Sequence, residues 1–170
     1  TIAAEPMLRY GGVQYYCGSQ QHIESFAERA AAMHDRAAYL RSVIAALEAA
    51  GGKPPIVSGG GTGTHRIDAT LDLFTELQVG SYIFMDDQYR VCALTPEDGD
   101  IPYETALLVD TRVISANSPG LVTVDAGIKS LATDAKPPLI NAGAAEGTVY
   151  FFMGDEQGAL VHPAGDLPAL

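Results

Sequence analysis

The feature that most constrains the fold is a long stretch of helical periodicity between residues 23 and 47. Its apolar residues recur at spacings of three and four, which places them on one face of an amphipathic helix. Two glycines at 51–52 and two prolines at 54–55 follow, so we predict that the helix ends before Gly51. The apolar face consists of Ile23, Phe26, Ala27, Ala30, Met33, Ala37, Leu40, Ile44 and Leu47.

Short apolar segments on both sides of this helix predict strands. Residues 12–16 precede it, and a second strand begins at Ile56. A short helix is expected at 68–74 and a further strand at 79–85. Because the order strand, helix, strand is the one that right-handed βα units require, we predict a parallel sheet or barrel.

After Asp86 the pattern changes to short strands separated by turns. The expected strands cover residues 105–115, 121–125, 148–153 and 158–161. We therefore predict an α/β part over residues 1–90 and an all-β part, a small barrel or sandwich, over residues 91–170. The boundary is expected between Asp86 and Asp100.

Charge and cysteine content exclude several classes of partner. Ten Lys+Arg against 21 Asp+Glu give a net charge of −11, which disfavours phosphate backbones and anionic membranes. No apolar run approaches the roughly 20 residues of a transmembrane helix. Cys17 and Cys92 lack CxxC spacing and are typical of reduced thiols. We expect a cytoplasmic protein that binds neither nucleic acid nor membrane.

A glycine-rich segment, SGGGTGT at residues 58–64, follows the second expected strand. Backbone N–H groups without shielding side chains, threonine hydroxyls and the positive end of a following helix suit a phosphate dianion. The segment is not a Walker loop, because His65 and Arg66 follow it. It also misses the dinucleotide fingerprint, because Thr64 stands where the third glycine belongs. The alternative is a flexible turn between two elements.

A second polar group, residues 15–22, lies between the first strand and the long helix. Polar residues at the C-terminal end of a barrel strand face the active-site mouth. Tyr16 is a candidate to hold a cofactor ring or a carboxylate, and His22 a candidate acid or base near neutral pH. The alternative for His22 is a cap on the helix or a place at the surface.

Five segments, in order along the chain, resemble the D-threonine aldolase and D-serine dehydratase family. They are GVQYYCGSQQH at 12–22, VSGGGTGT at 57–64, TELQVGSYIFMD at 75–86, VDAGIK at 124–129 and GDEQG at 154–158. The resemblance implies an alanine racemase-like fold: a pyridoxal-phosphate-binding (β/α)8 barrel and a β-domain, usually in a homodimer. Residues 1–90 would then be the C-terminal portion of the barrel, and residues 91–170 a β-domain that is incomplete at its C-terminus.

The resemblance also implies roles for individual residues. Tyr16 would contact the cofactor and its bound substrate, and His22 matches the histidine that takes the proton from the substrate β-hydroxyl in aldolase members. Asp125 and Lys129 are expected to be structural or to face a dimer partner. The residues expected to bind the cofactor are Tyr16, Gly60, Gly61, Thr62, Gly80 and Ser81.

Two parts of the family pattern have no match in this chain. The family's Schiff-base lysine lies on the first barrel strand, whereas Lys53, Lys129 and Lys136 stand in other contexts. The family's metal pair is a histidine followed two residues later by Cys or Asp, whereas His162 is followed by proline and alanine. We therefore predict no metal ligand here, and expect zinc, manganese or magnesium to bind through residues of a longer polypeptide or of a second chain.

The implied activity is that of a pyridoxal-phosphate- and metal-dependent lyase acting on D-β-hydroxy amino acids. A dehydratase would remove the α-proton and expel the β-hydroxyl with the metal as Lewis acid, and would act on D-serine or D-threo-3-hydroxyaspartate. A D-threonine aldolase would deprotonate that hydroxyl and break the Cα–Cβ bond. Two alternatives stay open: an amino-acid racemase on the same fold, and a non-catalytic phosphate-ligand binding module.

Overall fold

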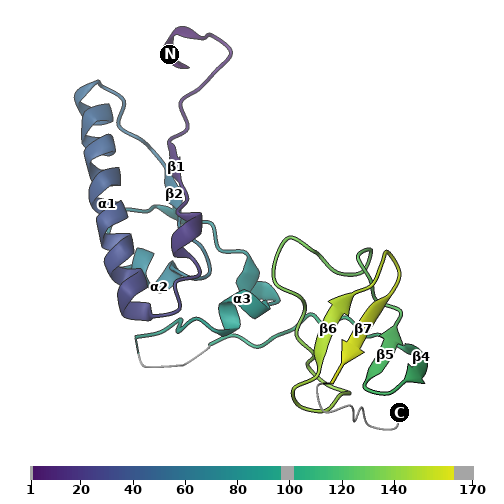
Figure 1. The fold of residues 1–170 in the computed structure, drawn as a ribbon. Helices are drawn as coiled ribbons and strands as arrows, with labels where there is room; N and C mark the ends of the chain where they lie inside the picture. The colour runs from purple at the N-terminus through teal and green to yellow at the C-terminus, as the bar shows by residue number, and fades with distance from the viewer. Residues whose placement is uncertain (1, 97–101, 163–170) are drawn as a thin grey trace. The chain divides into compact units, whose positions relative to one another are not determined.

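The computed structural model describes residues 2–96 and 102–162. The chain divides into two compact units, Thr1–Ala106 and Leu107–Leu170, which we call the α/β unit and the β unit (Figure 1). The first contains a parallel sheet with helices and the second an antiparallel sheet. This confirms the predicted combination of α/β and all-β structure.

Three parallel strands, in the order β1-β2-β3, form the sheet of the α/β unit. They are β1 (Val13–Tyr15), β2 (Val57–Gly59) and β3 (Glu76–Leu77). Tyr15 pairs with Gly59, which pairs with Leu77, so the C-terminal ends of the strands lie level at one edge. The shorter helical elements of the unit are η1 (Ile2–Ala4), η2 (Gly18–Gln20), α2 (His65–Asp68), η3 (Ser81–Ile83) and α3 (Asp87–Arg90).

The long helix α1 (Phe26–Ala49) connects β1 to β2 and runs beside them (Figure 1). Ser25 caps its first turn. At the other end, the N–H groups of Gly51 and Gly52 donate to the carbonyls of Glu48 and Leu47, the pattern of a Schellman motif. The predicted helix and the glycine stop are therefore confirmed.

The buried face of α1 follows most of the predicted stripe. Met33 packs with Cys17 and Ile67 in the core of the unit. Ala27, expected on the same face, is exposed, and a charged residue that the stripe did not include is fully buried. The buried residues of the helix are Arg29, Met33, Ala37 and Leu40.

Two expected elements of the α/β unit were wrong. The helix expected at 68–74 is the single turn α2, which begins directly after the glycine segment. The strand expected at 79–85 is absent, because β3 ends at Leu77 and the chain then coils into η3. The N–H of Met85 donates to the Ser81 carbonyl at 2.7 Å, which closes this coil.

The face of the parallel sheet that lies away from α1 is polar. Tyr15 packs against the core beside α1, so Gln14, and with it Ser58 and Glu76 in register, face the other way. The Gln78 amide donates to the Ser58 hydroxyl at 2.9 Å, and Gln14 donates to Gln78 at 3.2 Å. In a doubly wound sheet, apolar helices cover both faces, and a polar second face does not fit that arrangement. A polar face does fit the interior of a barrel near its mouth.

The β unit contains one four-stranded antiparallel sheet, in the order β4-β5-β7-β6, among its described residues (Figure 1). Its strands are β4 (Val113–Ser118), β5 (Leu121–Val124), β6 (Val149–Phe152) and β7 (Gly158–Val161). The last three confirm the predicted strands. The strand expected at 105–115 was mostly wrong, because residues 107–112 form no strand with any described part of the chain and β4 begins only at Val113.

Asp125 and Lys129, which the sequence motifs included, make local contacts in the β unit. Asp125 accepts hydrogen bonds from the Thr111 hydroxyl at 2.7 Å and the Arg112 N–H at 2.8 Å, and Lys129 pairs with Glu156. Both cysteines are free and buried in the α/β unit. Within the described parts of the chain, no helix has the length and apolar character needed to cross a bilayer.

Candidate active site

The predicted site residues follow the C-terminal ends of the three parallel strands, which meet at one edge of the sheet. They are Tyr16 after β1, the glycine loop (residues 60–64) after β2, and Gly80 and Ser81 after β3. A Cβ on Gly61 would lie 3.1 Å from the Tyr16 ring, and the N–H of Tyr82 donates to the Thr62 hydroxyl at 3.1 Å. The structure therefore brings these residues together.

One side of this site is open and the other is closed. Tyr16 is 46% exposed, Ser81 is exposed, and a Cβ on Gly80 would meet no atom within 4 Å. In contrast, every residue of the glycine loop is buried, and Thr62 is only 2% exposed. A ligand can therefore approach from the side of Tyr16, Gly80 and Ser81.

Within the glycine loop, protein groups already use part of the backbone. The Gly61 N–H donates to the Thr64 hydroxyl at 3.2 Å, and the Gly63 N–H donates to Gln21 Oε1 at 3.1 Å. A Cβ on Gly60 would overlap Asp68 Oδ2. The glycines thus make room for buried side chains. The single turn α2 adds little of the helix dipole expected behind the loop.

A buried network of three side chains holds the loop from behind. Gln21 and Thr64 have no exposed surface, and Asp68 is 2% exposed. Thr64 Oγ1 accepts from Gln21 Nε2 at 3.0 Å and donates to Asp68 Oδ2, whereas Asp68 Oδ1 has no partner among the residues that the structure describes. Sequence reasoning missed all three roles. The only signal was an acidic residue set between the apolar Ile67 and Leu71.

Burial raises the pKa of the Asp68 carboxyl from 3.8 to about 6, and the Thr64 hydroxyl opposes part of this rise. The folded state therefore binds the Asp68 proton more tightly than the unfolded chain does. The stability that this proton contributes is fully present below about pH 4 and is lost as the pH rises through about 6. We expect the free energy of unfolding to fall by up to ~3 kcal/mol across this window. Denaturant unfolding at a series of pH values measures the fall.

Two asparagine variants isolate this effect. Asp68→Asn should remove this part of the pH dependence, because an amide does not titrate. Asp72→Asn changes the net charge by the same amount, but at an exposed position. Asp72 has φ 48°, a conformation that asparagine tolerates. This variant should therefore keep the wild-type dependence of stability on pH. Equal profiles for the two variants would contradict the prediction.

The two predicted catalytic residues are linked through a residue that sequence reasoning missed. Tyr89 of α3 is 4% exposed, and its ring stacks on His22 with centroids 4.6 Å apart. The Tyr89 side chain also hydrogen-bonds to Tyr16, and burial together with this contact raises the pKa of Tyr89. His22 is exposed and does not cap α1, because Ser25 does. His22 and Tyr16 therefore lie on one connected cluster.

A further histidine lies on the other side of the glycine loop. His65 Nδ1 lies 2.7 Å from the Thr62 carbonyl, to which it donates, so Nε2 accepts from the Tyr103 hydroxyl at 3.1 Å. The ring of Tyr103 also contacts that of Tyr82, with centroids 5.6 Å apart. These aromatic contacts fix the orientation of the loop carbonyl and form a second wall beside it.

None of the three lysines follows a strand of the parallel sheet. Lys53 precedes the N-terminal end of β2, at the edge of the sheet opposite the glycine loop, and lies 3.9 Å from Glu48. Lys129 and Lys136 belong to the β unit. An amine that bonds covalently to a cofactor at this site is therefore not supplied by the α/β unit.

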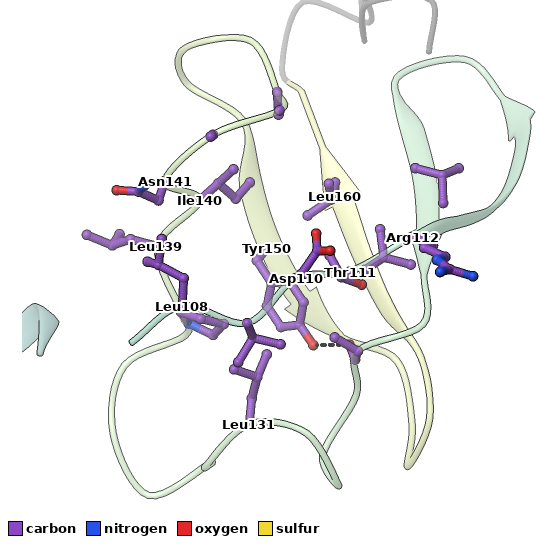
Figure 2. Close-up of a pocket in the computed structure, with 18 of the residues that line it drawn as sticks. Leu108, Asp110, Thr111, Arg112, Leu131, Leu139, Ile140, Asn141, Tyr150 and Leu160 are labelled. Carbon is purple, nitrogen blue, oxygen red and sulfur yellow. Dashed lines mark hydrogen bonds between the residues drawn. The ribbon is translucent and has the colours of Figure 1, made fainter. Parts of the chain in front are cut away.

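A cavity of about 860 Å³ in the β unit contains none of the predicted site residues. Its floor is the sheet face with Tyr150 and Leu160, and Leu139 and Arg112 lie on either side (Figure 2). The Tyr150 hydroxyl donates to the Ala126 carbonyl at 2.7 Å. Most of the lining is aliphatic, and the polar side chains along it include Asp110, Thr111 and Arg112.

The chain is similar in sequence to known proteins. Residues 106–170 match the family described as "Putative serine dehydratase domain". The chain is 36% identical over 167 residues to 3-hydroxy-D-aspartate aldolase of Paracoccus denitrificans (strain Pd 1222), covering 97% of this chain and 43% of that protein. It is 36% identical over 166 residues to D-threonine aldolase of an Arthrobacter species, covering 97% and 42%. The chain is thus similar, over nearly its whole length, to part of the D-threonine aldolase and D-serine dehydratase family.

A solved structure of a D-threonine aldolase, from Filomicrobium marinum, shows the same fold. It superposes with a TM-score of 0.83 at 35% identity, over 95% of this chain and 42% of that one. The resemblance drawn from five sequence segments is thus confirmed. The chain spans less than half the length of the D-threonine aldolase family members that it matches.

Proposed function

We propose that this chain supplies part of the active site of a pyridoxal-phosphate-dependent lyase that acts on D-β-hydroxy amino acids. One observation carries the proposal. The three segments that follow β1, β2 and β3, each carrying predicted site residues, meet at one edge of a parallel sheet in a chain related to two D-β-hydroxy amino acid aldolases. The edge at which parallel strands end is where such folds bind ligands.

The residues at this edge fit a phosphorylated aromatic cofactor. Gly80 leaves open space, Ser81 and Thr62 carry hydroxyl donors, and the half-exposed Tyr16 ring offers an apolar face. In our proposal, the phosphate lies against Gly60, Gly61 and Thr62, with Gly80 and Ser81 closing the site. When bound, the cofactor supplies an electron sink for charge that develops at the substrate α-carbon.

The chain's own residues orient the substrate and move a proton. We assign His22 as the base that removes the proton from the substrate β-hydroxyl, because its imidazole is exposed at the rim. Tyr89 holds the imidazole by stacking on it, and connects it to Tyr16. Tyr16 contacts the bound substrate and limits access of water on its side of the site.

The remaining parts of the reaction come from residues outside this chain in our proposal. These are the covalent lysine and the ligands of a divalent metal, zinc, manganese or magnesium. The polar sheet face with Gln14, Ser58 and Glu76 supports a barrel interior, so residues 1–90 are proposed as the C-terminal part of a (β/α)8 barrel and residues 91–170 as part of a β-domain. A cytoplasmic homodimer is proposed on the same family relationship.

The test is a spectroscopic titration with pyridoxal phosphate of the purified holoenzyme, in which this chain is accompanied by the residues proposed to supply the covalent lysine and the metal ligands. We expect saturable binding, and an absorbance of the bound cofactor that changes on addition of D-threonine or D-serine but not of the L-enantiomers. Glycine and an aldehyde as products identify an aldolase, whereas ammonia and a keto acid identify a dehydratase. Enantiomer interconversion without these products, or binding without any reaction, would overturn the proposal in favour of a racemase or a binding module.

A further inference from the structure

Behind the glycine loop lies a carboxyl group that the proposed chemistry does not use. Asp68 is 2% exposed, its Oδ2 accepts from the Thr64 hydroxyl, and its Oδ1 has no partner within the described part of the chain. The overlap of a Cβ on Gly60 with Asp68 Oδ2 shows that the carboxyl lies directly against the loop backbone.

Thr64 connects this carboxyl to an N–H of the loop. Its Oγ1 accepts from the Gly61 N–H at 3.2 Å and from Gln21 Nε2 at 3.0 Å, while its own proton goes to Asp68. An ionised carboxylate is a stronger acceptor than a neutral carboxyl. Ionised Asp68 therefore fixes the Thr64 hydroxyl in the one orientation that keeps the Gly61 N–H directed into the protein.

No positive charge pairs with Asp68 among the described residues. Burial, with a smaller contribution from Asp68, raises the pKa of the neighbouring Cys17 thiol. The charge of Arg36 lowers the pKa of Cys17, but the Arg36 side chain forms its ion pair with Asp35 and not with Asp68. The ring nitrogens of His65 contact the Thr62 carbonyl and the Tyr103 hydroxyl. The groups on the surrounding elements are Cys17 after β1, Met33 and Arg36 of α1, Leu77 of β3, and His65 and Arg66 of α2.

We propose that Asp68 is a positioning residue for the glycine loop, whose protonation frees the Gly61 N–H for an anion bound at the loop. A neutral carboxyl holds the Thr64 hydroxyl less tightly, so the hydroxyl and the Gly61 N–H can turn. A bound dianion in turn disfavours a negative charge on Asp68, so anion binding and proton uptake strengthen each other reciprocally. The inference rests on the proposed function in one respect, that the loop faces the cofactor phosphate.

Sulfate is the probe for the binding test, because its charge stays constant between about pH 5 and about pH 8, unlike that of a phosphate ester. In the purified protein we expect the affinity for sulfate to be about tenfold higher at pH ~5 than at pH ~8. This is the gain in affinity that one hydrogen bond to a charged group gives. Asp68→Asn should lose most of this dependence, whereas Asp72→Asn, with the same charge change, should keep it. The same pH profile in Asp68→Asn as in wild type would overturn the inference.

The ¹H–¹⁵N signal of Gly61 gives a readout that needs no anion. It should shift with pH in wild type and in Asp72→Asn, and stay constant in Asp68→Asn and in Thr64→Val, which lacks the connecting hydroxyl. Thermal unfolding confirms that each variant is folded. A constant Gly61 signal in wild type would overturn the inference even if sulfate binds. A signal that titrates in a protein that binds neither sulfate nor pyridoxal phosphate supports the role of Asp68 in the loop and overturns the proposed phosphate site.

Discussion

Replacing Arg29 by methionine should lower the free energy of unfolding by ~3 kcal/mol, although it removes a buried positive charge from the protein. The guanidinium group is fully buried and donates to the backbone carbonyls of Ile23, Glu24 and Ala93. The N–H of Ala93 in turn donates to the Glu24 carbonyl at 3.0 Å. Arg29 therefore joins the start of α1 to a segment 64 residues away along the chain.

Two opposing effects decide the size of this loss. Burial lowers the pKa of Arg29, which reflects the cost of holding its charge away from water, and its Nε atom has no partner in the described part of the chain. Against this, methionine would leave the partly buried Ile23 and Ala93 carbonyls without this donor, at ~1–3 kcal/mol each. Methionine preserves most of the side-chain volume and so separates the lost hydrogen bonds from cavity formation. We expect the unpaired carbonyls to outweigh the relief of desolvation.

Arg36→Met on the same helix is the matched control. Arg36 is half-exposed and, within residues 2–96 and 102–162, pairs only with its neighbour Asp35, so its replacement should change stability by less than ~0.5 kcal/mol. Denaturant unfolding of the two variants and of wild type measures the difference. Arg29→Met with wild-type stability would mean that the desolvation cost cancels the hydrogen bonds, as it does for some buried ion pairs.

Arg29 also bears on the candidate site, because the segment that it anchors follows α3. Cys92 and Leu94, on either side of Ala93, pack with Tyr89 in one buried cluster. Tyr89 contacts both His22 and Tyr16. We therefore expect Arg29→Met to loosen the position of the two candidate catalytic side chains as well as to destabilise the fold.

Elements that depend on local sequence could be predicted. The periodicity and glycine stop of α1, the strands β5, β6 and β7, and the glycine loop all lie where the pattern indicated. The sequence also predicted that the site residues lie close together, because each follows a strand and parallel strands end at a common edge of the sheet. Their proximity needed only the order of the elements.

The errors arose where an apolar run has no neighbouring strand. Residues 82–84 are apolar but largely exposed, and a hydrogen bond to Thr62 draws the chain into η3 instead of a strand. Residues 107–109 are likewise apolar and exposed, and no described strand pairs with them. A strand needs a second strand to bond to, and periodicity alone does not indicate whether one is present.

The groups that support the site could not be predicted, because they come together only in the folded chain. Gln21 meets Thr64 across 43 residues, and His22 meets Tyr89 from another element. Arg29 does carry a signal in the sequence, because it lies four residues before Met33, on the same face of the helix. A charged residue on an otherwise apolar stripe indicates a buried charge, and a buried charge needs hydrogen-bond partners.

Replacing Gly63 by alanine should weaken the binding of pyridoxal phosphate by about 100-fold, more than any other single methyl group added at the candidate site. A Cβ on Gly63 would overlap the backbone carbonyl oxygen of Gln21. Unlike the end of a flexible side chain, a backbone carbonyl moves only with its segment, so the loop or η2 must shift. The Gly63 N–H would then lose its bond to Gln21 Oε1, and with it the connection to Thr64.

The matched control is Gly11→Ala, at a position where a Cβ would meet no atom within 4 Å, and which should bind the cofactor as wild type does. Overpacking should also lower the stability of Gly63→Ala by ~1–3 kcal/mol, so binding is measured at a temperature where thermal unfolding shows the variant to be folded. Fluorescence titration with pyridoxal phosphate gives the affinity. Wild-type affinity in a folded Gly63→Ala variant would show that the cofactor does not depend on the glycine loop, because the loop cannot accept this methyl group without moving.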